Sequence, residues 1–414
     1  MIEEIDLALS SSAPLIDVIF FDAGGGHRAS AMALQTVIQR QERPWRIRLV
    51  NLRDVLEPID FVKRVTGLKI ENCYNGLLRH GITVGTLPML RTTQALIRLT
   101  HRGQVETLAR YWRDEAPALV LSMIPNFNRA MFEGLRAADE ESARPATPMA
   151  TILTDLADYP PHFWIERQEQ YLICGTTAAA EQAIAMGHPV HRVFQTSGMI
   201  VRPEFYDHRR ADRRRERRRL GLDPDITTGI VMFGGYGSRQ MLTIARRIKA
   251  AGLRTQLIFM CGHNDELREK LLAMNLPYRC RVEGFTRDVA GFMAAADYLI
   301  GKPGPGSISE ALVMGLPVIV ERNAWTMIQE RFNTDWIARN ELGVVLQSFF
   351  SEIEEGVAAM IDEARLRHFK ERVVAHENRA VFEIADMIGT MLAAPPPPGS
   401  EDTYRSRQLR FATA

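Results

Sequence analysis

The sequence predicts an α/β protein with two parallel sheets, each covered by helices on both faces. Short apolar runs rich in β-branched residues alternate with amphipathic stretches, and this alternation ends near the middle of the chain and then restarts. The runs are nearly continuous in apolar residues, which is typical of strands buried on both faces. With 414 residues the chain exceeds one ordinary core, so two domains are expected. Each doubly wound, Rossmann-like sheet would bind ligands at the carboxyl ends of its strands.

The predicted strands fall into two series. The first series lies at 16–21, 46–52, 118–123, 149–156 and 171–175. The second lies at 229–235, 255–262, 278–285, 296–304, 316–321 and 343–346. After the first strand, Ala29, Ala33 and Val37 repeat at the spacing of a buried helix face.

Four segments are expected along the chain. The first domain is assigned to residues 1–205, the second to 206–351 and a helical segment to 352–394. Residues 395–414 are proline-rich and then polar, so a disordered tail is expected there.

Composition narrows the class of protein and its compartment. The net charge is +1, so overall charge favours no acidic partner. The four cysteines show no CxxC pair and no zinc-like spacing, which fits a reducing compartment. The N-terminus is acidic where a signal peptide would be basic, and no run of about 18 apolar residues occurs. A cytoplasmic protein that associates with a membrane at its surface is expected.

An arginine-rich run at 208–225 separates the two series of strands. A solvated helix is one interpretation, and a docking face for anionic lipid head groups is another. Nucleic acid is not expected as a partner, because no aromatic-bearing binding module accompanies the run. The DPD sequence at 223–225 is interpreted as a turn and not as a metal site.

Three glycine-rich turns each follow a predicted strand and open a helix. The first is Gly24–Gly26 before His27, the second is at 234–238, and the third is at 301–312, with a helix from about Ser307. Helix N-termini present unpaired N–H groups and a positive dipole end, which suit phosphates. One such turn is common in any βα unit, and none matches a Walker A loop or a clean GxGxxG. Three of them in a doubly wound chain indicate a site for an anionic ligand.

Glu310 lies one helical turn after Ser307. A carboxylate there could accept both hydroxyls of a ribose whose diphosphate meets the helix N-terminus. The alternative is an ordinary first-turn glutamate favoured by the helix dipole.

Several motifs together resemble one family. In chain order they are GGGHRASA, TILTDLADYPPHFW, GMIVRPEF, VMFGGYGS, CGHNDEL, VEGFTRDVAGFMAAADYLIGKPGPGSISEALVMGLPVIV and QERFN. From about residue 17 to 346 the chain resembles the monogalactosyldiacylglycerol synthases, which are GT-B glycosyltransferases. It is more distantly similar to the undecaprenyl-linked UDP-GlcNAc transferase of peptidoglycan synthesis.

The resemblance implies a GT-B fold, with the two domains facing across a cleft and segment 352–394 returning toward the first domain. It implies an inverting transfer of a hexose from UDP-galactose or UDP-glucose to a membrane lipid, diacylglycerol, giving a β-glycosyl lipid and UDP. No cofactor and no metal are expected. The alternatives are a UDP-GlcNAc-type transferase to another lipid, a UDP-sugar 2-epimerase and a non-catalytic UDP-sugar sensor.

The resemblance also assigns the donor site, position by position. Glu310 would bind the ribose, Phe285 would lie at the uracil, and the glycine turns would pack against the diphosphate. Gln329, Glu330 and Asn333 would touch the sugar. The full donor set is Gly234, Gly235, Gly237, Ser238, Phe285, Lys302, Gly304, Gly306, Ser307, Glu310, Gln329, Glu330 and Asn333.

His27 is the first candidate for the general base. Inversion requires the acceptor hydroxyl to lose its proton as it attacks, and a base with a near-neutral pKa suits that step. The helix N-terminus opposes protonation of the imidazole and so keeps it able to accept a proton. Asp155 is the competing base, and a purely positioning role is the alternative for His27.

The acceptor side is assigned to Gly25, Gly26, Pro125 and Trp164, with residues 161–164 as an aromatic lip. Segment 61–103 is basic and amphipathic, which suits an anionic membrane surface, although a core helix pair with basic edges fits as well. Two positions depart from the family. Ile124 replaces a histidine of the plant-like members, and Tyr236 replaces an acidic residue.

Overall fold

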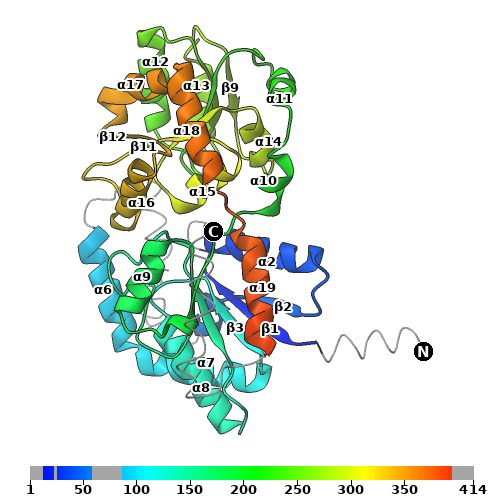
Figure 1. The fold of residues 1–414 in the computed structure, drawn as a ribbon. Helices are drawn as coiled ribbons and strands as arrows, with labels where there is room; N and C mark the ends of the chain where they lie inside the picture. Colours follow the sequence, from blue (N-terminus) through cyan, green and yellow to red (C-terminus); the bar gives the residue numbers. More distant parts are fainter. Residues whose placement is uncertain (1–12, 23–25, 58–85, 394–414) are drawn as a thin grey trace.

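The computed structural model describes residues 13–22, 26–57 and 86–393. Two parallel sheets of six strands lie one above the other, each covered by helices (Figure 1). The predicted α/β class with two doubly wound sheets is confirmed.

The first sheet has the order β2-β1-β3-β4-β5-β6, and all its pairs are parallel. Its strands are β1 (Leu15–Phe20), β2 (Arg46–Asn51), β3 (Leu119–Ser122), β4 (Met149–Ile152), β5 (Tyr171–Cys174) and β6 (Val193–Gln195). The order reverses between β1 and β3, which is where a doubly wound sheet binds its ligand.

The second sheet has the order β12-β11-β10-β7-β8-β9. Its strands are β7 (Thr228–Met232), β8 (Gln256–Met260), β9 (Cys280–Glu283), β10 (Tyr298–Gly301), β11 (Val318–Glu321) and β12 (Gly343–Leu346). Here the order reverses between β7 and β10, so the second and third glycine turns follow the two strands of the switch point.

Helices cover both sheets. With the first sheet are α2 (Gly26–Arg40), α3 (Leu52–Leu56), α6 (Thr86–Leu99), α7 (His101–Glu115), α8 (Asn128–Glu141), α9 (Thr177–Ala185) and the short 3₁₀ helix Val190–Arg192. In the second half are α10 (Pro203–His208), α11 (Arg213–Arg219), α12 (Gln240–Ala251), α13 (Asp265–Leu272), α14 (Val289–Ala294), α15 (Pro305–Val313), α16 (Ile328–Arg339), α17 (Phe349–Ile361), α18 (Glu363–Ala375) and α19 (Ala380–Ala393). Among the described residues, no helix combines the length and the apolar character needed to cross a membrane.

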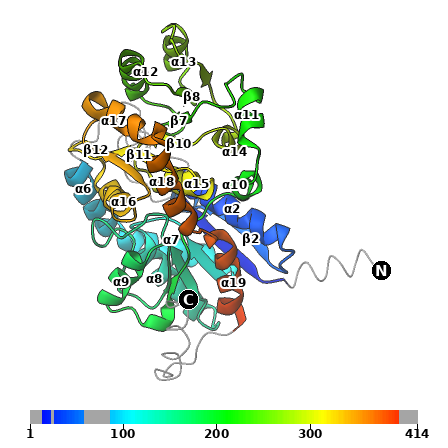
Figure 2. The same ribbon diagram turned by 45° about the horizontal axis from the view of Figure 1, so that its top comes forward.

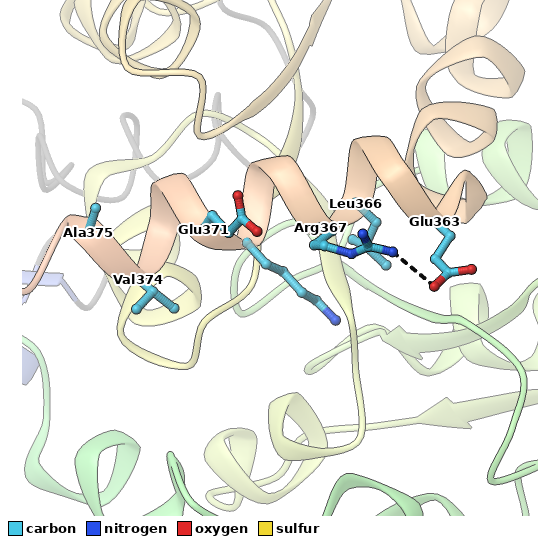
Figure 3. A pocket seen from close by; sticks show the side chains of 7 residues that line it. Glu363, Leu366, Arg367, Glu371, Val374 and Ala375 are labelled. Atoms are coloured by element: carbon cyan, nitrogen blue, oxygen red, sulfur yellow. Dashed lines mark hydrogen bonds and ion pairs between the residues drawn. The ribbon is translucent and has the colours of Figure 1, made fainter.

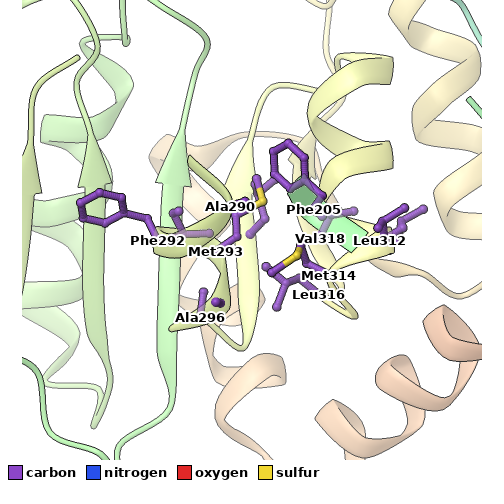
Figure 4. Close-up of a cluster of buried hydrophobic side chains, with 14 of the residues drawn as sticks. Phe205, Ala290, Phe292, Met293, Ala296, Leu312, Met314, Leu316 and Val318 are labelled. Atoms are coloured by element: carbon purple, nitrogen blue, oxygen red, sulfur yellow. The ribbon is translucent and has the colours of Figure 1, made fainter. Parts of the chain in front are cut away.

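The core of the second domain has two halves, one on each face of the sheet. Successive residues of a strand point to opposite faces, so Leu299 joins one half and Ile300 the other. Figure 4 shows the first half, in which Phe205 of α10 and Met293 of α14 pack among apolar side chains of the sheet and α15. This burial on both faces explains why the inner strands β7, β8 and β10 are almost wholly apolar, whereas the edge strand β9 carries Arg281 and Glu283.

Segment 352–394 divides between the two domains. Apolar residues of α17 and α18 pack into the core of the second domain. In contrast α19 packs beside α2, and its Val381, Ile384 and Ile388 are buried in the core of the first sheet (Figures 1 and 2). The return toward the first domain is therefore made by α19.

The two chain segments that connect the domains are hydrogen-bonded to each other. Asn378 Nδ2 donates to the carbonyl of Met199 over 3.0 Å, and the N–H of Ser197 donates to Glu383 Oε2 over 2.8 Å. A Cβ on Gly198 would lie 2.6 Å from Asn378 Cγ, so the segments touch without a side chain between them.

The arginine-rich run is partly structural. Arg217 of α11 is buried, pairs with Asp297 and donates from Nε to the carbonyl of Ala295 over 2.9 Å. Burial raises the pKa of Asp297, but the opposing charges of Lys370, Arg217 and Arg213 hold it below its usual value. The picture of a fully solvated or lipid-facing run is therefore wrong for Arg217. The predicted DPD turn is confirmed, because Asp223 Oδ1 accepts the N–H of Asp225 over 2.9 Å.

Candidate functional site

Two glycine turns meet at the switch point of the second sheet. Gly234 and Gly237 adopt positive φ of 80° and 59°, conformations that glycine enters without strain. The turn after β10 carries Lys302, whose Cε lies 3.9 Å from where a Cβ of Gly234 would be. α15 begins at Pro305 directly after this turn, so its N-terminal N–H groups open beside both loops. The arrangement can hold a diphosphate.

A third loop presses against the glycine turn. The N–H of His263 donates to the carbonyl of Gly235 over 2.8 Å. Gly262 has φ of 59°, and a Cβ there would lie 2.1 Å from the same carbonyl oxygen. The position of the turn therefore depends on the missing side chain of Gly262.

Gly262→Ala is expected to displace the turn and to weaken the binding of a diphosphate there at least about 10-fold, since backbone atoms cannot move aside cheaply. Isothermal titration with UDP measures the change. Gly252→Ala is the matched control, because Gly252 also has positive φ, 62°, but a Cβ there meets nothing within 4 Å. UDP affinity equal in both variants would contradict the role given to the close approach.

Aromatic rings border the site after β8 and β9. His263 and Phe285 stack with centroids 4.0 Å apart and planes 17° apart, and Tyr236 lies 5.9 Å from His263. Phe285 is 58% exposed, so its ring is available to a ligand. A flat heterocyclic base fits such a stack. The sequence analysis assigns Phe285 to the uracil but gives no role to His263, although His263 belongs to the CGHNDEL motif.

Glu310 lies on α15 with its side chain 21% exposed. Arg202 Nε lies 3.6 Å from Glu310 Oε1, and Arg202 also pairs with Glu204 at 2.8 Å. Burial raises the pKa of Glu310 to about 7, and the charge of Arg202 opposes part of that rise. Arg202 comes from the connecting segment, and the sequence reading did not count it as a site residue.

A polar group lies beside the turn after β10. Glu330 is buried, and its Oε1 lies 3.8 Å from Lys302 Nζ. Burial raises the pKa of Glu330, while the positive charge of Lys302 lowers it by a smaller amount. Asn333 is fully buried and donates from Nδ2 to the carbonyl of Pro303 over 2.8 Å, while its Oδ1 has no hydrogen-bond partner. A Cβ on Gly304 would lie 3.5 Å from Glu330 Oε1 and 3.6 Å from Ser307 Oγ. A carboxylate, an ammonium group and an unsatisfied amide together suit a ligand rich in hydroxyls.

The remaining predicted donor residues lie in these same loops. Gln329 stands beside Glu330 at the start of α16 and donates to the Sδ of Met327 over 3.6 Å. Gly235 belongs to the first turn and Gly306 to the first turn of α15, and a Cβ on either would meet nothing within 4 Å. Ser238 Oγ accepts the N–H of Gln240 over 3.2 Å, just before α12.

His27 is the second residue of α2. Its ring meets the ring of Trp164 edge-on, with centroids 6.1 Å apart and planes at 89°. Nδ1 is buried without a hydrogen-bond partner, and burial lowers the pKa of His27 to about 4. The imidazole is therefore neutral at pH 7, but its pKa lies below the near-neutral value that the sequence analysis expects for the base.

Asp155 joins this cluster through Trp164. The indole Nε1 donates to Asp155 Oδ2 over 2.9 Å. Burial raises the pKa of Asp155 to about 7; the bond from Trp164 opposes this, and the carboxylates of Glu330 and Asp158 add to it.

Trp164 is fully buried beneath these groups. The expectation that Trp164 meets the acceptor within an aromatic lip is therefore corrected. Its buried ring packs edge-on against His27, and its Nε1 donates to Asp155. Its burial follows from the fold of the loop after β4, which brings it into a small core with Leu153 and Leu172.

The loop that carries Trp164 is held by Asp158. This buried carboxylate accepts the N–H groups of His162 at 3.0 Å, Phe163 at 2.9 Å and Trp164 at 2.6 Å. The sequence reading quoted Asp158 within a motif but gave it no role.

The other acceptor residues lie around this loop. Pro125 precedes Asn126, which has φ of 68° and donates its N–H to the carbonyl of Phe163 over 2.8 Å. Gly26 opens α2, with open space where a Cβ would be. Gly25 and residues 61–85 of the basic segment lie outside the described residues, which include α6 and the start of α7 from that segment.

A shallow cavity of about 550 Å³ lies elsewhere, along α18 (Figure 3). Its lining comes from that one helix and includes the ion pair of Arg367 with Glu363 and the exposed Val374. None of the predicted site residues borders it. Across the described parts of the chain, no group of three or more His, Cys, Asp or Glu side chains is arranged to hold a metal ion.

Comparison with known proteins supports the resemblance seen in the motifs. Residues 230–323 match the glycosyltransferase family 28 C-terminal domain. The chain is 26% identical over 342 residues to monogalactosyldiacylglycerol synthase 1, chloroplastic, of Arabidopsis thaliana. That match covers 79% of this chain and 61% of the relative, so the chain spans less than two thirds of the relative's length.

Solved structures share the fold. MurG of Acinetobacter baumannii matches with a TM-score of 0.58 at 13% identity, over 91% of this chain and 99% of that one. The S. aureus MnaA–UDP structure matches with a TM-score of 0.56 at 17% identity, over 92% and 97%. The expected GT-B fold is confirmed by these likenesses together with the two six-stranded parallel sheets.

Proposed function

We propose that this GT-B chain, whose residues 230–323 match the glycosyltransferase family 28 C-terminal domain, is an inverting hexosyltransferase. It would move a sugar from a UDP-sugar to a lipid hydroxyl. The acceptor is diacylglycerol, and the products are a β-glycosyl lipid and UDP. The observation that carries the proposal is the site at the switch point of the second sheet, where two glycine turns and the N-terminus of α15 meet beside Lys302 and Glu330. The likeness to a plant galactolipid synthase and to a UDP-bound structure supports the choice of substrates.

In the proposed reaction His27 takes the proton of the acceptor hydroxyl while that oxygen attacks the anomeric carbon. The bond from this carbon to the diphosphate breaks, and its electron pair leaves with UDP. The glycine turns and the N-terminus of α15 supply fixed N–H donors where this charge grows, and Lys302 adds a positive charge. Asp155 is the competing base, with a pKa of about 7.

The lipid acceptor requires work at a membrane surface. We assign that contact to segment 61–103, whose basic and apolar residues suit anionic lipid, on the cytoplasmic face of the membrane.

A transfer assay tests the proposal. The protein is incubated with labelled UDP-galactose, UDP-glucose or UDP-GlcNAc over mixed micelles of diacylglycerol and anionic lipid. Label in the organic phase from one donor would support the proposal and identify the sugar. Conversion of UDP-GlcNAc without an acceptor would instead favour an epimerase, and UDP binding without any turnover would favour a sensor.

The affinity for UDP-galactose is expected to rise with pH. Ribose hydroxyls donate to the ionised form of Glu310, and a pKa of about 7 leaves that form scarce at pH 6 and abundant at pH 8. The expected gain between these pH values is about 10-fold, with uptake of ligand releasing a proton. Titration calorimetry in two buffers of different ionisation enthalpy measures both effects.

Glu310→Gln is the control for this pH dependence. It should bind UDP-galactose more weakly and with the same affinity at both pH values. A wild-type affinity that does not change between pH 6 and pH 8 would contradict the assignment of Glu310 to the ribose.

A further inference from the structure

A second cavity, of about 390 Å³, opens beside the carboxyl ends of β11 and β12. It is separate from the donor residues, none of which lines it. Its lining consists of Gln240, Thr243, Glu321, Asn323, Ala324, Trp325, Gln347, Ser348, Phe349 and Phe350.

The order of the strands places this cavity next to the sugar side of the donor site. Along the sheet, Phe285 follows β9, the glycine turns follow β7 and β10, and β11 and β12 come last. The loop after β11 carries Trp325 and then leads into α16, where Gln329 and Glu330 stand. The cavity therefore lies at the next strands of the sheet, beyond the loops to which the uracil, the diphosphate and the sugar are assigned.

Two aromatic side chains stand exposed at the cavity. Trp325 is 59% exposed, and its backbone N–H donates to Asn323 Oδ1 over 2.8 Å. Asn323 in turn donates from Nδ2 to the carbonyl of Gln347 over 3.2 Å, which ties the loop to the end of β12.

Phe350 is 71% exposed. The guanidinium of Arg247 lies 5.9 Å from the centroid of its ring, and Arg247 is paired with Glu354 at 2.6 Å. The two exposed rings offer flat surfaces on which a ligand can stack.

The rest of the lining is polar but carries no positive charge. Glu321 accepts from Gln240 Nε2 over 2.8 Å and from the N–H of Phe349 over 2.9 Å, which leaves acceptor positions on both carboxylate oxygens. None of the residues that line the cavity is Lys, Arg or His. A phosphate would meet the carboxylate of Glu321, with the nearby Arg247 already paired with Glu354, and an acyl chain would offer no donor to the acceptor positions that Glu321 leaves open.

We propose that this cavity is a second sugar subsite, which binds the pyranose ring of a glycoside independently of the nucleotide sugar. A pyranose has an apolar C–H face for the aromatic rings and hydroxyls for Glu321 and the amides, which matches both kinds of lining. The identification of the glycoside as a glycolipid head group rests on the proposed function. The binding of a pyranose at this cavity does not depend on that function.

Saturation-transfer NMR tests the subsite directly. The probes are methyl β-D-galactopyranoside and methyl β-D-glucopyranoside, added to the full chain saturated with UDP. Saturation is expected to reach the ring protons of at least one glycoside. Trp325→Ala and Phe350→Ala should each reduce the transfer at least about five-fold, since each removes one stacking surface.

Leu272→Ala is the matched control, because Leu272 is an apolar side chain of similar exposure, 56%, on α13. It should leave the transfer unchanged, and thermal unfolding checks that all variants stay folded; Trp325→Phe, which keeps a flat ring, should retain most of the signal. Absence of transfer in the wild type, or equal transfer in the wild type and both alanine variants, would overturn the proposal. So would loss of the signal when UDP-galactose replaces UDP, because the glycoside would then occupy the donor's own hexose position.

The outcome is independent of the transfer assay. Glycoside binding without lipid labelling would contradict the proposed function but support the sugar subsite.

Discussion

Replacing His27 by alanine is expected to lower kcat by roughly 10²- to 10⁴-fold, the usual contribution of a positioned general base. The affinity for UDP should stay the same, because His27 belongs to the first sheet and the proposed nucleotide site to the second. The lipid transfer assay gives kcat, and titration with UDP gives the affinity. A variant that keeps its kcat would remove His27 from the reaction.

The pH profile of kcat/KM separates His27 from Asp155 when it is measured in the Glu310→Gln variant, where the titration of Glu310 does not contribute. A general base works only when deprotonated, so kcat/KM falls as the pH drops through the pKa of the base in the free enzyme. With His27 as the base the fall lies near pH 4, and with Asp155 it lies near pH 7. We expect the lower value.

Asp155→Asn provides the matching control, since the amide oxygen can still accept from Trp164 Nε1. It should leave the fall near pH 4 in place and reduce kcat much less than His27→Ala. In the Glu310→Gln background, a fall near pH 7 that disappears when Asp155→Asn is added would transfer the role of base to Asp155.

Asp158→Ala is expected to lower the free energy of unfolding by roughly 3 kcal/mol or more, because several buried N–H groups lose their acceptor at once. These N–H groups belong to the loop that carries Trp164, so kcat should fall as well. Urea unfolding and the transfer assay measure the two effects.

Asp212→Ala is the control for this change. Asp212 also accepts two backbone N–H groups, at 3.0 and 3.3 Å from Arg214 and Arg215, but it lies exposed at the start of α11. It should cost only about 1 kcal/mol as a helix cap and leave kcat unchanged. Equal losses of stability in the two variants would contradict the role given to the loop of Asp158.

Local pattern was enough to predict most of the fold. Every predicted strand is present, because most are short apolar runs and their alternation with helices is visible along the chain; the edge strands β2 and β9 alternate apolar with charged residues. β6 was missed, since its three residues include only two apolar ones, at its start. The burial of Trp164 and Arg217 could not be predicted, because their partners come from distant segments and nearby residues made an exposed lip and a solvated helix reasonable.

The candidate site divides in the same way. Glycine turns and Glu310 were found because strand, turn and helix follow one another in sequence. Arg202 and Asp158 were missed as working residues. Arg202 meets Glu310 only after the chain has crossed between domains, and Asp158 acts on backbone N–H groups, which leave no trace in side-chain identity.

The return of α19 to the first sheet has a consequence for biosynthesis. Val381, Ile384, Ala385 and Ile388 complete the apolar interior of the first half, yet they follow the whole second domain in the sequence, so the ribosome adds them after it. The nascent first half must wait, with part of its apolar surface uncovered, until the whole second half has been made. Domains usually mature in the order in which they are synthesised. In this chain the first domain completes its apolar core only after the second domain has been synthesised.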